Sequence, residues 1–118
     1  MSTTTKSPRA VILPVAEHLV DVLGQFCTRT ELAGSLRRQT AMVGDIEIVA
    51  IPVPRLDLFG HPIAASTSLD TFLSDRVALV KDGPRYKQFV YRGYTVDLFL
   101  ATNETWGSVF TLRTGSAE

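Results

Sequence analysis

The chain has 118 residues, of which 45% are hydrophobic and 20% are charged, as in a globular protein with a single core. Lys plus Arg equals Asp plus Glu at 12 each, so the overall charge provides no general attraction to nucleic acid. A lone cysteine, Cys27, excludes an internal disulfide, and two histidines, His18 and His61, leave little basis for a zinc hydrolase or a histidine-based triad. Apolar runs stay short of the ~18 residues of a membrane span and no signal peptide opens the chain, so we expect no membrane contact.

The first predicted element is a helix. Residues 1–8 are polar and we expect them to be a flexible N-terminus, followed by a single domain over residues 9–118. Apolar residues over 8–26 recur at three- and four-residue spacing, which indicates a helix with one apolar face. Pro14 should lie in the first turn of this helix or mark its start.

Two strands and a second helix are predicted in the middle of the chain. Residues 28–33 form a short strand, and residues 44–52 form a second strand that is apolar almost throughout and therefore central in the sheet. Residues 39–43 connect the two strands. Residues 53–67 contain prolines, a glycine and small residues, which favours an irregular loop. Ser68 is a suitable N-cap for a short amphipathic helix.

Three further strands and a final helix complete the pattern. Arg92-Gly93 is placed for a tight hairpin turn between the last two strands, and Asn103 for the cap of a helix over residues 104–113. The strands cover residues 78–81, 86–92 and 94–100. This order of elements predicts an α+β sandwich, a mixed β-sheet with helices packed on one face.

Three acids stand in apolar strand sequences. Asp45 and Glu47 are separated by one residue in a β-branched apolar run, so their side chains share one strand face, about 6–7 Å apart at Cα. Asp97 has the same setting in the last strand. If the two strands are neighbours, the three carboxylates converge and repel one another, with raised pKa values, unless a cation is present. Two Mg²⁺ ions about 3.5–4 Å apart suit such a set and serve nucleotidyl transfer, and Mn²⁺ can replace them.

A glycine-serine turn precedes the first two acids. Gly34-Ser35 is followed by Arg37-Arg38, and together they offer backbone donors, a hydroxyl and fixed positive charge. These groups suit a phosphate chain. A phosphate-binding turn shortly before a carboxylate pair indicates chemistry on a nucleoside triphosphate.

These blocks together resemble a known family. Gly34-Ser35-x-Arg37-Arg38 followed by Gly44-Asp45-x-Glu47 is similar to the nucleotidyltransferase signature of family X DNA polymerases, the DNA polymerase beta type. Val96-Asp97-Leu98 resembles the strand that bears the family's third catalytic carboxylate, and Thr114-Gly115-Ser116 resembles its Thr-Gly-Ser turn. The resemblance covers residues 28–116 and is strongest to the small members often encoded by bacteriophages.

The resemblance implies a nucleotidyltransferase fold like the polymerase beta palm, with two groups of site residues. The metal-binding and catalytic group would be Asp45, Glu47 and Asp97, with Asp97 best placed to help activate an attacking hydroxyl. The nucleotide-binding group would be Gly34, Ser35, Arg37, Arg38, Gly44, Thr114, Gly115 and Ser116. Within that second group, the serine, the second arginine and the second glycine would contact the β- and γ-phosphates. The first arginine would support the turn, and the Thr-Gly-Ser segment would lie beside the sugar and base.

The chain departs from the family pattern at three places. Glu47 stands where polymerases usually carry Asp, and Thr95 stands where they often carry an Arg that steadies the acids. Leu112-Arg113 replaces the aromatic pair that usually precedes the Thr-Gly-Ser turn. No helix-hairpin-helix region precedes the palm, and the chain stops where a nucleotide-selection subdomain should begin. We therefore expect a palm-only protein or a chain cut after Glu118.

The implied activity is metal-dependent transfer of a nucleotide from an NTP or dNTP to a polynucleotide 3′-hydroxyl, with release of pyrophosphate. Its partners would be the nucleoside triphosphate, a weakly held nucleic-acid 3′ end, and a second copy or a partner protein, in the cytoplasm of a bacterial or phage-infected cell. Two alternatives stay open. One is a toxin–antitoxin type enzyme that moves AMP onto a protein hydroxyl, and the other is a nucleotide-binding or assembly module with little catalysis.

Overall fold

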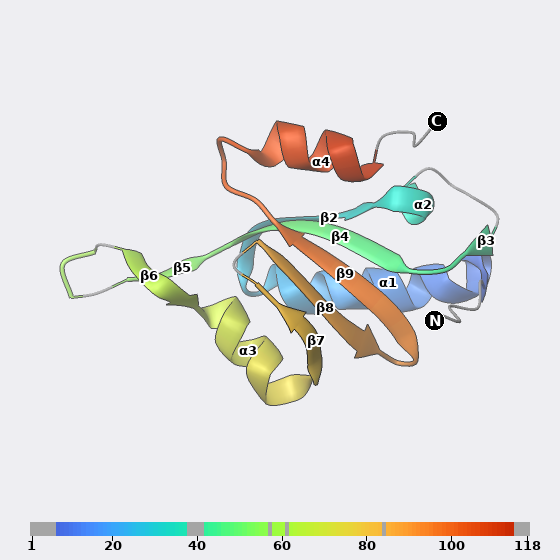
Figure 1. Ribbon diagram of the computed structural model, residues 1–118, viewed down its shortest axis with the longest axis horizontal. Helices are drawn as coiled ribbons and strands as arrows, with labels where there is room; N and C mark the ends of the chain where they lie inside the picture. The colour runs from blue at the N-terminus through green and yellow to red at the C-terminus, as the bar shows by residue number, and fades with distance from the viewer. Residues whose placement is uncertain (1–6, 38–41, 57, 61, 84, 115–118) are drawn as a thin grey trace.

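A computed structural model describes residues 7–37, 42–56, 58–60, 62–83 and 85–114 (Figure 1). The helices are α1 (Arg9–Gly24), α2 (Gly34–Arg37), α3 (Ser68–Arg76) and α4 (Trp106–Thr114). The strands are β1 (Ser7–Pro8), β2 (Cys27–Ala33), β3 (Met42–Val43), β4 (Ile46–Pro52), β5 (Pro54–Leu56), β6 (Pro62–Thr67), β7 (Leu79–Asp82), β8 (Tyr86–Tyr91) and β9 (Tyr94–Leu100). None of these helices is both long enough and apolar enough to cross a membrane.

A mixed five-stranded sheet forms the centre of the molecule. Its strand order is β2-β4-β9-β8-β7, with β4 and β9 parallel and the other neighbours antiparallel. The predicted α+β class with a mixed sheet is therefore confirmed. The sequence also predicted that the strand now seen as β4 would be central, and β4 has a hydrogen-bonded neighbour on each side. Its apolar run follows from this position, because an interior strand is covered on both faces.

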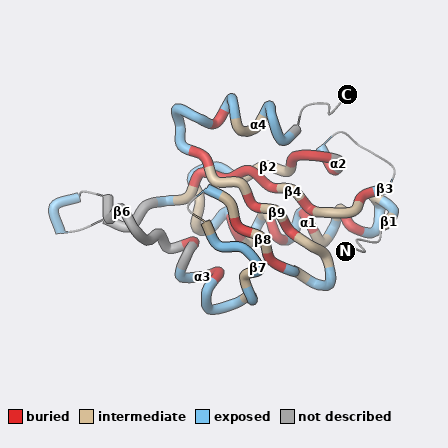
Figure 2. The backbone as a smooth tube through the Cα atoms, in the orientation of Figure 1, coloured by how far each residue is buried: buried red, intermediate tan, exposed pale blue. Residues whose placement is uncertain are grey.

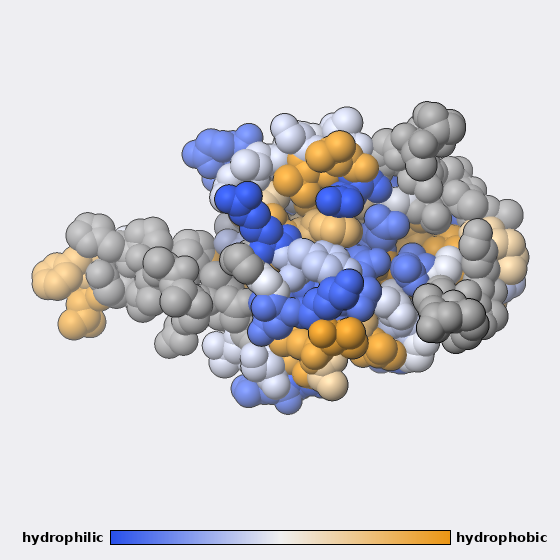
Figure 3. All heavy atoms as spheres, viewed as in Figure 1, coloured by the Kyte–Doolittle hydropathy of each residue, from blue (hydrophilic) through white to orange (hydrophobic). Residues whose placement is uncertain are grey.

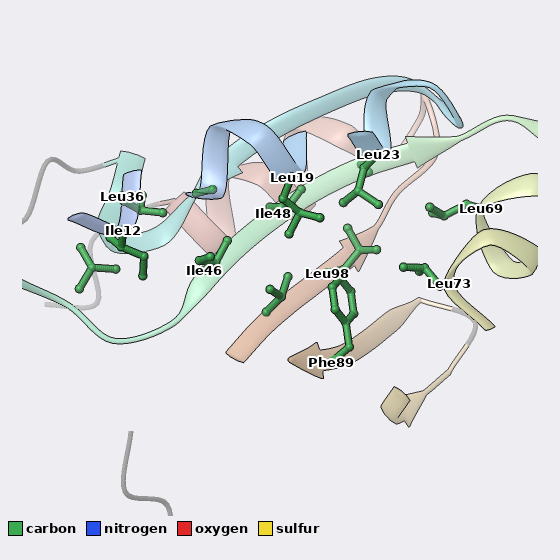
Figure 4. Packing of buried hydrophobic residues seen from close by; sticks show 14 residues of the cluster. Ile12, Leu19, Leu23, Leu36, Ile46, Ile48, Leu69, Leu73, Phe89 and Leu98 are labelled. Atoms are coloured by element: carbon green, nitrogen blue, oxygen red, sulfur yellow. The ribbon is translucent and has the colours of Figure 1, made fainter. Parts of the chain in front are cut away.

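The larger part of the core lies between α1, α3 and one face of the sheet (Figure 4). Ile12, Leu19 and Leu23 of α1 pack there against Ile46 and Ile48 of β4. Each of these side chains is almost completely removed from water, which stabilises the fold by about 1.5–3 kcal/mol per residue. The buried segments of the backbone accordingly follow the inner strands (Figure 2).

A smaller core lies on the opposite face of the sheet, under α4. Trp106 of α4 packs with Val49 and Ile51 of β4, whose side chains alternate with those that face α1. The prediction of helices on one face thus describes α1 and α3, whereas α4 covers part of the other face. The reason is that β4 carries apolar residues at consecutive positions and so needs a cover on each side.

The first helix begins earlier than its proline suggests. α1 starts at Arg9, so Pro14 lies in its second turn, and the prediction that Pro14 is in the first turn or marks the start was wrong. Pro14 lacks the N–H that would bond the carbonyl oxygen of Ala10. The burial of Ile12 in the main core favours helix before the proline and outweighs this loss. Of the predicted flexible N-terminus, residues 1–6 lie outside the described residues.

Two short strand pairs occupy segments that were predicted as connections. Pro54 and Pro62 are the first residues of β5 and β6, which form an antiparallel hairpin, so the prediction of an irregular loop there was wrong. Proline is tolerated at the first residue of a strand because its missing N–H is least needed there. β3 lies within the other predicted connection and pairs with β1.

The cap of the last helix also differs from the prediction. Thr102 and Thr105 exchange two hydrogen bonds: the Thr105 N–H donates to Thr102 Oγ1 at 3.2 Å, and the Thr102 N–H donates to Thr105 Oγ1 at 2.8 Å. This reciprocal pair closes the entry to α4 as a capping box does. Asn103 lies inside that turn, so its prediction as the cap was wrong.

Candidate functional site

Two of the predicted acids lie directly opposite each other on neighbouring strands. The parallel register of β4 and β9 pairs Glu47 with Asp97. Both side chains belong to the sheet face on the α4 side, because Ile46, Ile48 and Val96 next to them point into the core under α1. The two strands are therefore neighbours, as convergence of the acids requires.

Asp45 lies just before β4, on the same side of the molecule. Its Oδ1 atom is buried and has no hydrogen-bond partner among the described residues. Burial raises the pKa of the Asp45 carboxyl, and the charge of Asp97 raises it further. A buried acceptor without a donor destabilises a fold by about 1–3 kcal/mol, and a cation can satisfy such an oxygen.

Asp97 is held by two donors on β8. The phenol of Tyr86 donates to Asp97 Oδ1, and the Gln88 amide donates to the same oxygen at 3.0 Å. Gln88 Nε2 also lies 3.2 Å from Tyr86 Oη, so the three side chains form one network. Burial, the hydrogen bond to Asp97 and the charge of Asp97 raise the pKa of Tyr86 to about 12. Both donors bind Oδ1, and Oδ2 is the other oxygen of this carboxylate that can accept a ligand.

Sequence reasoning missed Tyr86 and Gln88, although a signal for them was present. The predicted turn at Arg92-Gly93 is confirmed, with positive φ values of 51° and 85° at its two residues. A two-residue turn fixes the strand register, so counting back from it pairs Gln88 with Asp97. Tyr86, two residues further back, must then share that face.

Gly34 connects the glycine-serine turn to the acids. It has a positive φ of 61°, and a Cβ built on it would lie 2.6 Å from Glu47 Oε2. The backbone conformation therefore favours glycine, and a Cβ here would also displace the carboxyl group of Glu47. The segment does not form an open turn, because Gly34 begins α2, whose Leu36 is buried in the main core. Arg9 of α1 donates to the Leu36 carbonyl at 3.2 Å and holds α2 in place.

The other predicted phosphate-binding residues are arranged as follows. Ser35 belongs to α2, and Gly44 lies directly before Asp45. Arg37 does not point to the acids: its guanidinium lies 3.7 Å from Glu31 and 5.4 Å from the ring centroid of Phe110. Arg38 is outside the described residues.

The end of α4 lies on the same sheet face as the acids. The Arg113 guanidinium lies 4.1 Å from the ring centroid of Phe99, and Phe99 follows Asp97 on that face. Thr114 is the last residue of α4, while Gly115 and Ser116 are outside the described residues. The start of the predicted Thr-Gly-Ser segment thus lies on the sheet face that carries the acids.

The three acids approach one another without forming a closed metal site. Within the part of the chain that the structure describes, no group of three His, Cys, Asp or Glu side chains is close enough to hold one ion. The donor chemistry nevertheless fits Mg²⁺ or Mn²⁺, which prefer carboxylate oxygens, and the buried Asp45 Oδ1 lacks a partner. In this arrangement, Asp97 Oδ1 is already occupied by Tyr86 and Gln88.

The sheet and its helices form a polymerase-beta-like fold. Among solved structures, the chain is similar to Leishmania infantum polymerase beta in a ternary P/T complex, with a TM-score of 0.73 and 20% sequence identity. It is also similar to the same polymerase in a ternary gap complex, with a TM-score of 0.71 and 22% identity. No protein-family model and no curated protein sequence matches the chain.

The matches cover nearly all of this chain but only part of each polymerase chain. Both matches cover 96% of this chain, and 49% and 44% of the polymerase chains, so the chain spans less than half of the length of these structures. At this level of identity the similarity shows a polymerase-beta-like fold.

Proposed function

We propose that the protein is a metal-dependent nucleotidyltransferase that transfers a nucleotide from an NTP or dNTP to a polynucleotide 3′-hydroxyl and releases pyrophosphate. One observation carries this proposal. Glu47 lies opposite Asp97 across two parallel strands and against the backbone of Gly34, and two residues before it Asp45 has a buried Oδ1 without a hydrogen-bond partner among the described residues. Acids and the start of α2, a segment with groups suited to phosphate, therefore meet at one place on a polymerase-beta-like fold.

In this proposal the three acids hold the metal. Asp45, Glu47 and Asp97 supply only oxygen ligands, and Tyr86 and Gln88 fix the orientation of the Asp97 carboxylate. A bound divalent cation would neutralise charge on the triphosphate and lower the pKa of the attacking hydroxyl. Asp97 would accept the hydrogen bond of that hydroxyl and orient it.

The glycine-serine segment would bind the triphosphate. Gly34 allows the backbone to approach Glu47, which brings the phosphate and metal positions together. Ser35, Arg38 and Gly44 would contact the β- and γ-phosphates, and Arg37 would support the segment through its contact with Glu31. Thr114, Gly115 and Ser116 would lie beside the sugar and base.

The polynucleotide and protein partners complete the proposal. The matched polymerases are ternary complexes, which supports a nucleic-acid substrate for this chain. A band of hydrophilic residues crosses the viewed face between hydrophobic groups (Figure 3). Val80 and Val90, on the two strands nearest one edge of the sheet, are exposed apolar residues, which supports a second copy or a partner protein there. We propose a phage-type protein acting in the cytoplasm.

A transfer assay tests this function. The protein is incubated with Mg²⁺ or Mn²⁺ and each labelled nucleotide, together with a primed template, with a single strand, or alone. Extension of the nucleic acid is the expected result. Label on the protein would instead indicate the adenylylating type, and tight nucleotide binding without transfer would indicate a binding module. Arg38→Ala should weaken triphosphate binding by about 1.5–3 kcal/mol, and an unchanged Kd would remove Arg38 from the phosphate site.

A further inference from the structure

A cavity of about 470 Å³ lies between α1, α3 and the β8–β9 hairpin, on the side of the sheet away from the acids. Its apolar wall consists of side chains from all three elements: Leu19, Val22, Phe72, Leu73 and Phe89. Figure 4 shows Leu19, Leu73 and Phe89 in this part of the core. A half-open, largely apolar hollow of this volume has the size of a small-molecule site.

The rim of this cavity is cationic. Arg76 and Arg92 both line it, and each guanidinium lies 5.3 Å from the centroid of an aromatic ring in the same wall, Phe72 for the first and Tyr91 for the second. His18 is also at the rim, with Nδ1 2.7 Å from Tyr91 Oη. These stacked contacts hold the two guanidinium groups over the apolar wall.

Acidic residues are absent from the described lining of this cavity. The two acids on α1 nearest to His18 in sequence, Glu17 and Asp21, line a separate cavity against β2. The helix α1 therefore presents its acids to the other cavity, and among the described lining residues of the hollow beside α3 the charged side chains are basic.

We propose that this cavity binds a small anion with a flat apolar body, such as an aromatic carboxylate. The apolar body would lie against Phe72 and Phe89, where its surface leaves water, and the carboxylate would accept hydrogen bonds from Arg76 and Arg92. Arginine suits this role because its planar guanidinium can bind a carboxylate through two parallel hydrogen bonds. Since the aromatic rings already orient both guanidinium groups, less conformational entropy is lost on binding. The site is independent of the proposed transfer activity.

The first test compares two probes that differ in charge. Naphthoate and the neutral naphthylmethanol are titrated into the full chain, with calorimetry for affinity and backbone amide NMR for location. Naphthoate should bind roughly tenfold more tightly than the alcohol, with shifts in α1, α3 and the β8–β9 turn. Equal affinity of the two probes, or shifts on the α4 side of the sheet, would overturn the proposal.

The second test uses exposed residues, so folding is not at risk. Arg76→Gln should weaken naphthoate binding roughly tenfold and leave naphthylmethanol binding unchanged. Arg92→Asn should act in the same direction, and Asn tolerates the positive φ of 51° at this position. Arg29→Gln is the matched control, because Arg29 stacks 4.2 Å from the Trp106 ring centroid, under α4 and outside the cavity. If the control weakens naphthoate as much as Arg76→Gln does, the rim does not bind the anion.

Discussion

Replacing Asp45 by Asn should separate the stability of this fold from its proposed activity. Asp45 Oδ1 is buried and has no partner among the described residues, and both burial and the charge of Asp97 oppose ionisation of Asp45. Asn keeps an amide oxygen at this position, so the gain comes from removing the buried charge, and screening by solvent on the exposed part of the group limits it to about 1 kcal/mol. The amide removes the repulsion and offers a donor toward Asp97. The variant should therefore be more stable by about 1 kcal/mol, which corresponds to about 4 °C in Tm for a domain of this size.

The pH dependence of this difference follows from the direction of the pKa shift. A raised pKa means that folded Asp45 holds its proton more tightly than unfolded Asp45, so the folded state is penalised only when Asp45 is ionised. The penalty is absent below the ordinary value of 3.8 and complete above the raised value. Urea titrations should show the variant to be more stable near neutral pH, with the difference disappearing as the pH falls below about 4.

Metal and activity measurements complete the assay. In the wild type, Mg²⁺ added after chelation should raise Tm, since a ligand that binds only the folded state stabilises it. Asp45→Asn should lose that rise and lose nucleotide transfer. Asp75→Asn, which changes an exposed carboxylate on α3, should alter stability by less than about 0.5 kcal/mol and keep both properties. A variant at Asp45 that is less stable near neutral pH, or that keeps the Mg²⁺ effect and the transfer, would refute the reasoning.

Two further substitutions test the groups around the acids. Tyr86→Phe removes one donor to Asp97 and should lower the free energy of unfolding in urea by about 0.5–1.5 kcal/mol. Because the pKa of Tyr86 is raised to about 12, folded Tyr86 resists ionisation, and the free energy of unfolding should fall as the pH rises above 10. In an alkaline absorbance titration, the wild type should show one tyrosine that ionises at higher pH than the others, and the variant should lack it. Gly34→Ala should destabilise by about 1–2 kcal/mol, since the positive φ and Glu47 both oppose a Cβ. Gly107→Ala, in open space on α4, should be neutral or stabilising by up to about 1 kcal/mol, and equal Tm values for the two glycine variants would contradict the requirement for glycine at Gly34.

The strands of the sheet could be predicted because their signals are local. β8 and β9 are rich in aromatic and β-branched residues and are joined at Arg92-Gly93. Both turn residues have positive φ, and a glycine in such a two-residue turn is a strong hairpin signal. The sequence did not predict that β4 pairs with β9; it predicted only that the acids would converge if the two strands were neighbours. Parallel strands are not joined by a tight turn, so no local signal fixes their pairing or register.

The features that were missed depend on tertiary contacts. The start of α1 before Pro14 is decided by the burial of Ile12 against other elements, and helix signals in the sequence contain no information on that burial. The direction of Arg37 toward Glu31 and Phe110 likewise depends on where β2 and α4 lie. The three acids could be predicted as a group. The partners of Asp97, which are Tyr86 and Gln88, could be found only after the register between β8 and β9 was known.

The parallel pairing of β4 with β9 also determines when the acidic cluster arises during folding. The β8–β9 hairpin is local, can form within about 1–10 μs, and already joins Gln88 to Asp97. Glu47 and Asp97 face each other but are 50 positions apart in the chain, so their contact requires closure of a long loop. We expect the repulsion between Asp45 and Asp97 to develop after the rate-limiting barrier. Relieving it should then slow unfolding and leave the folding rate nearly unchanged.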